Sequence, residues 1–184
     1  MKIRLDFVTN SSSSSFVCEI CGETVSGWDL GYEDAGMFEC VNGHVVCQEH
    51  MLDVPREKML DYLKRDGWYN NVTKEELEEM TDEELLELFM VDLGELPEMF
   101  CPICQFEKYS REDMASYLLT VYKVPKEEVF AEIKSRNKRR RKLYDFEYID
   151  YVTQKFNLDL AEIQASWREK YKTYSEFADS LAKF

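Results

Sequence analysis

The feature that most constrains this chain is the placement of its cysteines and histidines. All six cysteines and both histidines fall into four pairs, and two or three residues separate the members of each pair. In chain order the pairs are Cys18 with Cys21, Cys40 with His44, Cys47 with His50, and Cys101 with Cys104. A tight turn between two such residues presents two ligands to one ion, and zinc requires four in a tetrahedron. The eight ligands therefore predict two zinc sites with none left over.

The composition of these sites indicates a structural metal. A catalytic zinc usually keeps three protein ligands and one open position, whereas four protein ligands, mostly thiolates, can fill each site here. Both histidines would be ligands, so neither could act as a general base. No βαβ pattern flanks either Cys-x-x-Cys pair, which argues against a thioredoxin-like redox role. We therefore expect two structural zinc ions per chain and identify no catalytic residue or small-molecule substrate, which favours a non-enzymatic protein.

Three short motifs around the ligands resemble the RING family of zinc-binding domains and its treble-clef relatives. They are Cys18-Glu19-Ile20-Cys21, Gly43-His44-Val45-Val46-Cys47 and Cys101-Pro102-Ile103-Cys104. The resemblance covers residues 18–50 and 101–104 and implies a small α+β module with two zinc ions. The chain departs from the family pattern in three places. Val46 replaces an aromatic residue, His50 replaces the commoner cysteine, and the 50-residue spacer before Cys101 is long.

The same resemblance implies a cross-braced pairing, in which the first and third pairs share one ion and the second and fourth share the other. Site one would then consist of Cys18, Cys21, Cys47 and His50, and site two of Cys40, His44, Cys101 and Cys104. Sequential pairing is the alternative. In that arrangement the first two pairs bind one ion and the last two pairs bind the other.

The N-terminal residues carry a second pattern. Lys2–Thr9 alternates apolar and polar residues and predicts a short strand, and the run Ser11–Ser15 predicts a flexible loop or turn. The string Asp6-Phe7-Val8-Thr9-Asn10, followed by five serines and Phe16, resembles an opening found on otherwise unrelated proteins of Gram-positive bacteria and their mobile elements. That resemblance implies a bacterial or phage source. Residues 1–8 contain no apolar run of the kind a signal peptide needs, so we expect a cytoplasmic protein.

The rest of the chain is expected to be helical. Thr73 and Thr81 each open a capping box followed by Leu or Met at helical spacing. After Cys104 the apolar residues recur at helical spacing, with a weak repeat at an offset of 34 that predicts two helix–turn–helix copies. We therefore expect an α+β fold in three parts. Residues 1–50 and 101–104 form the zinc module, residues 51–100 an acidic helical insertion, and residues 105–184 an all-helical C-terminal domain.

The charge distribution bears on the partner. The formal net charge is -14, which favours a partner protein with a basic surface over nucleic acid or an anionic membrane. Eleven acidic residues against one lysine lie between Lys74 and Glu98. Such a run is either a solvated helix face or a docking surface. The candidate partner-binding residues are Glu75, Glu76, Glu79, Glu83 and Glu87.

One strongly basic segment runs against this trend. Residues 134–142 contain seven positive residues of nine. Arg139, Arg140 and Arg141 at its centre are candidates for contact with the phosphates of RNA or DNA. Alternatively, the segment pairs with the acidic helices of its own chain or of a neighbouring chain.

These features favour a zinc-stabilised protein-binding module. A specific version is an acidic inhibitor that mimics nucleic acid and occupies the basic channel of a nuclease, as in an anti-CRISPR protein. The RING resemblance implies an alternative, a ubiquitin-ligase-like protein that recruits a conjugating enzyme through Ile20 and the segment before Cys101. Gln105 stands where that family often has a basic residue. A third hypothesis is a nucleic-acid-binding protein that uses the basic segment.

Overall fold

The computed structural model describes residues 13–66, 72–89 and 95–184. The predicted strand Lys2–Thr9 lies outside the described residues. The chain divides into two compact units, residues 1–100 and residues 101–184. The described residues contain eight α-helices and two two-stranded antiparallel sheets. The predicted α+β class with a helical C-terminal half is confirmed.

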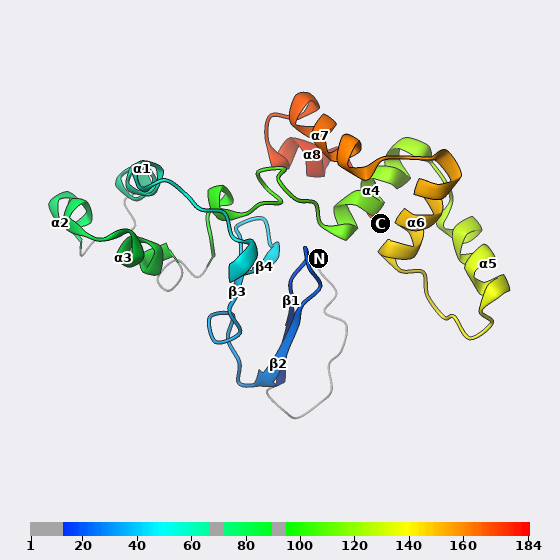
Figure 1. Cartoon of the computed structure of the whole chain (residues 1–184), viewed down its shortest axis with the longest axis horizontal. Helices are drawn as coiled ribbons and strands as arrows, with labels where there is room; N and C mark the ends of the chain where they lie inside the picture. Colours follow the sequence, from blue (N-terminus) through cyan, green and yellow to red (C-terminus); the bar gives the residue numbers. More distant parts are fainter. Residues whose placement is uncertain (1–12, 67–71, 90–94) are drawn as a thin grey trace. The chain divides into compact units, whose positions relative to one another are not determined.

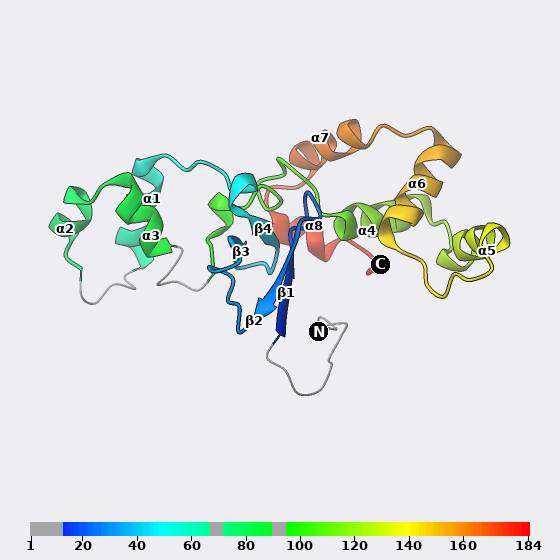
Figure 2. The same ribbon diagram turned by 60° about the horizontal axis from the view of Figure 1, so that its bottom comes forward.

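Two short antiparallel hairpins supply the β-structure of the first unit (Figures 1 and 2). Strand β1 (Ser13–Val17) pairs with β2 (Thr24–Trp28), and β3 (Met37–Glu39) pairs with β4 (Val45–Cys47). Phe16 and Val25 face each other across the first hairpin. Both pack against a small core of Cys18, Met37 and Cys47. This core joins the two hairpins at the ends of β1 and β4, where candidate ligands lie.

The serine run does not form the predicted loop where the structure describes it. Ser13, Ser14 and Ser15 are the first residues of β1, and Ser15 pairs with Ser26 of β2. Serine composition predicts turns because the side chain competes for local backbone hydrogen bonds. Here the strand ladder and the anchored Phe16 decide the conformation instead. Ser11 and Ser12 lie outside the described residues.

The helical part of the first unit follows the second hairpin. It consists of η1 (Gln48–His50), α1 (Arg56–Asp66), α2 (Lys74–Glu79), α3 (Asp82–Glu87) and η3 (Glu98–Phe100). The predicted capping boxes at Thr73 and Thr81 are confirmed, since each threonine accepts from the N3 backbone and each N3 glutamate bonds back. Each helix buries apolar side chains, among them Met59 of α1, Leu77 of α2 and Leu85 of α3.

The second unit is built from two copies of one motif. Its helices are α4 (Arg111–Tyr122), α5 (Lys126–Arg136), α6 (Asp145–Phe156), α7 (Leu160–Lys170) and α8 (Tyr174–Asp179). Both ends of α6 lie 34 residues after those of α4, and both ends of α7 lie 34 residues after those of α5. Helices α4 and α6 pack together. The predicted repeat is confirmed as two helix–turn–helix copies.

Aromatic side chains fill the core of the second unit. Tyr148, Trp167 and Phe177 are fully buried, and the rings of Trp167 and Phe177 lie 4.3 Å apart. The Tyr148 hydroxyl donates to the Val124 carbonyl oxygen at 2.8 Å, which ties α6 to the α4–α5 turn. Within the described ranges, none of the helices has the length and apolar character needed to cross a bilayer.

Candidate metal centres

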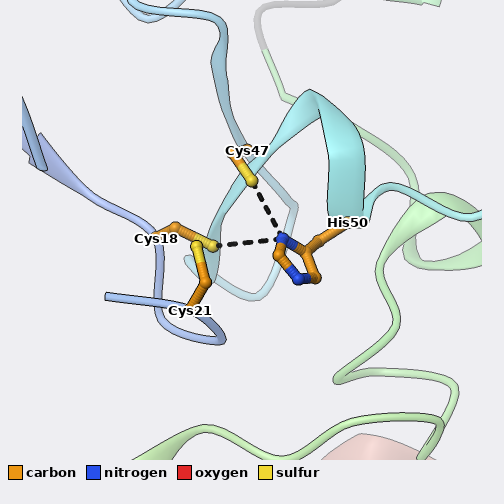
Figure 3. Close-up of side chains that lie close together, drawn as sticks. All are labelled: Cys18, Cys21, Cys47 and His50. Carbon is orange, nitrogen blue, oxygen red and sulfur yellow. Dashed lines mark hydrogen bonds between the residues drawn. The ribbon is translucent and has the colours of Figure 1, made fainter. Parts of the chain in front are cut away.

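Four ligand residues meet between the two hairpins of the first unit (Figure 3). Cys18 follows β1, Cys21 lies in the next turn, Cys47 ends β4, and His50 ends η1. The His50 Nδ1 lies 2.9 Å from the Cys47 Sγ and 4.0 Å from the Cys18 Sγ. All four ligand atoms lie within 4.8 Å of one another. Two ligands of a tetrahedral zinc ion are about 3.6–3.8 Å apart, so the side chains are arranged around a space of the right size.

The backbone around this cluster explains how the pair Cys18 and Cys21 is presented. The Cys18 N–H donates to the Glu23 carbonyl and the Gly22 N–H donates to the Cys18 carbonyl, both at 2.9 Å. Gly22 has a φ of 78°, a left-handed conformation that side-chain-bearing residues rarely adopt. The Glu19 N–H donates to the Val45 carbonyl at 2.9 Å and fastens the turn to β4. The turn is therefore a rigid knuckle.

The two buried thiols of this cluster have pKa values shifted in opposite directions. Burial raises the pKa of the Cys47 thiol to about 12, and the nearby Cys18 sulfur adds to that rise. Burial also acts to raise the pKa of Cys18, but the backbone N–H groups of Cys21, Cys47 and Ile20 outweigh it, so the net direction is downward. Closely spaced thiolates repel one another unless a cation lies among them. The arrangement therefore matches a set of ligands for a cation.

The second group of ligands consists of Cys40, His44, Cys101 and Cys104, and all four are buried. The Cys40 Sγ lies 3.4 Å from the His44 Nδ1, and the four ligand atoms lie within 4.8 Å of one another. Gly43, at a φ of 76°, forms the turn between Cys40 and His44. The Gln105 N–H donates to the Cys101 carbonyl and closes a similar turn around Cys101 and Cys104.

Backbone pairing explains why Cys101 reaches Cys40 across such a long spacer. Leu96 forms a parallel bridge with Cys40. The Leu96 N–H donates to the Glu39 carbonyl at 2.8 Å, and the Val41 N–H donates to the Leu96 carbonyl at 3.0 Å. The chain that enters Cys101 is thereby held beside β3. The insertion can leave and return without disturbing the ligands.

The observed grouping is the interleaved one, with the first pair beside the third and the second pair beside the fourth. The sequential grouping is not the one that the structure brings together. Each group offers three sulfurs and one imidazole nitrogen, a donor set suited to zinc. With four protein ligands around each ion, neither site would keep an open position for a substrate.

The candidate partner-binding residues lie on the surface. Glu75, Glu76, Glu79, Glu83 and Glu87 are all exposed. Glu76 has a structural task as well, because its carboxylate accepts from the Thr73 backbone and hydroxyl. Those hydrogen bonds, led by the one from the backbone, lower the pKa of Glu76. Ile20 packs against the small core of the hairpins, and Gln105 is exposed.

The structure separates the three central arginines. Arg139 and Arg141 are exposed, whereas Arg140 is half-buried, forms an ion pair with Glu147 and lies over the Tyr144 ring at 5.1 Å. The sequence pattern does not distinguish the three arginines. It also gives no sign that Phe146 is 42% exposed and stacks on Tyr144.

Comparisons with known proteins give no further guidance. No protein-family model, no curated protein and no solved structure matches this chain.

Proposed function

We propose that this chain is a non-enzymatic, zinc-stabilised module of bacterial or phage origin that binds a partner protein through an acidic surface. The observation that supports it most is the pair of four-ligand clusters, each composed of three cysteines and one histidine. Zinc bound in such closed sites contributes folding free energy to a small module whose hydrophobic core is too small to stabilise it alone. The order of the ligands along the chain and their interleaved grouping support a RING-like, cross-braced module.

The acidic surface consists of Glu75, Glu79, Glu83 and Glu87 on α2 and α3, together with the capping residue Glu76. Two neighbouring acids are already neutralised, since Lys64 pairs with Glu78 and Arg56 pairs with Asp82. Apart from Glu76, the residues of the acidic surface have no ion pair or side-chain hydrogen bond within the described part of the chain. Exposed negative charge of this kind raises the association rate with a basic partner and sets its salt dependence. A nucleic-acid mimic that inhibits a nuclease is one version of this function.

Metal content tests the first part of the proposal. Protein purified in metal-free buffer is expected to contain about two zinc equivalents per chain by elemental analysis. A value near zero, or iron with visible absorbance, would contradict the proposed zinc module.

Affinity purification from the native host tests the second part. Replacing Glu75, Glu79 and Glu87 with lysine is expected to abolish partner capture while leaving zinc content and helicity unchanged. The matched control replaces Arg139, Arg140 and Arg141 with alanine and is expected to retain the partner. Loss of capture in the arginine variant alone would contradict the acidic-surface hypothesis.

One observation favours nucleic acid as a second candidate partner. Lys138, Arg139 and Arg141 are exposed and, among the described residues, form no ion pair. Phe146, a few residues later in the chain, is exposed and stacks on Tyr144. Exposed cations and an exposed aromatic side chain in one segment suit single-stranded nucleic acid.

Fluorescence anisotropy with a labelled oligothymidine tests this second candidate. The double replacement of Arg139 and Arg141 with alanine is expected to weaken binding about tenfold and to reduce the slope of log affinity against log salt by about 1.4, or about 0.7 for each lost contact with a single strand. The control replaces the exposed Lys172 and Lys183 with alanine. If the arginine and lysine variants weakened binding equally, the binding would be nonspecific charge attraction and not a site at Arg139 and Arg141.

A further inference from the structure

An apolar pocket of about 310 Å³ lies in the first unit beside the acidic helices. Its apolar lining comes from the segment after η1 and from α1, α3 and η3, through Met51, Leu52, Val54, Met59, Leu86 and Phe100. Met59 and Phe100 are buried at its base, and the other four side chains are half-buried. The volume is at the small end of the range for ligand pockets, about 300–1,000 Å³. It suits one bulky side chain better than a cofactor.

The pocket walls are continuous with the candidate metal ligands. Met51 directly follows His50, and Phe100 directly precedes Cys101. The Leu52 N–H donates to the Phe100 carbonyl oxygen at 2.9 Å and joins these two walls. The residues that would hold the metal ions therefore also fix the pocket. The two methionines can adapt to the shape of an occupant because their side chains are unbranched and flexible.

Acidic side chains surround the same pocket. Asp53, Asp82 and Glu83 contribute to its lining. Asp82 pairs with Arg56 at 2.8 Å, whereas Asp53 and Glu83 are exposed and form no ion pair within the described ranges. The first 100 residues carry 23 acidic and 7 basic residues, a net charge of -16. An occupant must therefore combine an apolar group for the pocket with positive charge around it.

We infer that this pocket binds one bulky apolar side chain of a Lys- or Arg-rich segment in a partner protein. The inference rests on the proposed function, because it names the chemistry that the acidic surface recognises. Exposed ion pairs are individually weak and salt-screened, so they set the association rate and not the specificity. A buried apolar anchor in a preformed pocket supplies the specificity.

Two labelled peptides test this inference by fluorescence anisotropy. Both are Lys- and Arg-rich, and they differ only at the central residue, which is tryptophan in one and serine in the other. The tryptophan peptide is expected to bind the zinc-loaded protein at least about tenfold more tightly, as burial of one large apolar side chain implies. Leu86→Ser is expected to bring the two affinities together. Leu60→Ser, on α1 outside the pocket lining, is the matched control and keeps the difference, provided that circular dichroism shows both variants folded.

The acidic surface is tested separately with the same peptides. Replacing Glu75, Glu79 and Glu87 with lysine is expected to weaken both peptides alike while leaving their ratio unchanged. If the glutamate replacements did not weaken either peptide and the ratio of the two affinities was unchanged, the acidic-surface proposal would be wrong and the pocket proposal would stand. Equal affinity of the two peptides for the unmodified protein, or no binding of either, would overturn the pocket. If Leu86→Ser instead converted a dimer to a monomer in sedimentation, the occupant would be a second copy and the inference would be wrong.

Discussion

Cys101 distinguishes the two possible metal pairings. It shares a site with Cys40 and His44 in the interleaved pairing and with Cys47 and His50 in the sequential one. Its Sγ lies with the ligand atoms of Cys40 and His44, although more than 50 residues separate it from His44. Removal of one thiolate weakens the hold of the remaining three ligands on the ion. A cysteine released from metal becomes a reactive thiol. The cysteine that becomes reactive when Cys101 is replaced is therefore one that shares a metal ion with Cys101.

Cys101→Ser is expected to lose about one zinc ion per chain. It is also expected to expose the Cys40 thiol to alkylation, while Cys47 stays protected. Cys47→Ser is the matched variant, in which Cys18 becomes reactive and Cys40 does not. Elemental analysis and mass-spectrometric mapping of alkylated cysteines measure both effects. Alkylation of Cys47 in the Cys101→Ser variant would establish the sequential pairing instead.

At the residue scale, the sequence could predict the ligand pairs but not their grouping from spacing alone. Two residues of a tight turn meet because they are close in the chain, whereas the meeting of Cys40 with Cys101 depends on the backbone bridge at Leu96. The grouping was available only through the RING resemblance. Similarly, nothing in the basic segment distinguishes Arg140 from its neighbours, because its partner Glu147 lies beyond a turn.

At the element scale, the two helix–turn–helix copies differ at one informative position. Lys123 and Asn157 end α4 and α6 with left-handed φ values of 55° and 51°. Asparagine tolerates this conformation better than a residue such as lysine, and glycine adopts it without strain. The first turn therefore carries backbone strain that the second largely avoids.

Lys123→Gly is expected to raise the free energy of unfolding by about 0.5–1 kcal/mol, because the relieved strain exceeds the entropy that glycine adds to the unfolded chain. Asn157→Gly is expected to change it by much less. Urea unfolding followed by circular dichroism measures both. Equal stabilisation by the two variants would show that the turns are not strained differently.

Elements were predicted best where local chemistry decides them. The threonine capping boxes of α2 and α3 satisfy their own first-turn amides, so the sequence alone locates both helix starts. The repeat was visible because equivalent apolar residues face the core in both copies. Strand β1 was not predicted, because its three serines are held in the strand by pairing with β2. Serine composition gives no information about such pairing. The predicted extent of the zinc module, residues 1–50 with 101–104, stays a prediction.

At the scale of the whole molecule, charge and metal dependence are unevenly distributed. Residues 101–184 carry 16 basic and 14 acidic residues, a net charge of +2, against -16 for the first 100 residues. The core of α4–α8 contains Tyr148, Trp167 and Phe177 and no candidate metal ligand. By contrast, the short hairpins of the first unit share a core that is partly made of ligand cysteines. The two parts should therefore respond differently to loss of metal.

Chelation of the metal is expected to unfold the first unit and to leave the α4–α8 core folded. Two-stranded hairpins are marginal in water, and helices as short as α2 and α3 are not stable alone. Since α4–α8 contain more than twice as many helical residues as α1–α3, most of the helical circular dichroism signal should remain after treatment with EDTA and a thiol reductant. Limited proteolysis with mass spectrometry should then cut within residues 13–66 and leave a resistant fragment within residues 105–184. Untreated protein is the control and should resist cleavage in both regions. Loss of all helicity in one step would show that the helical core depends on the metal clusters, and an unchanged digestion pattern would show that the first unit does not.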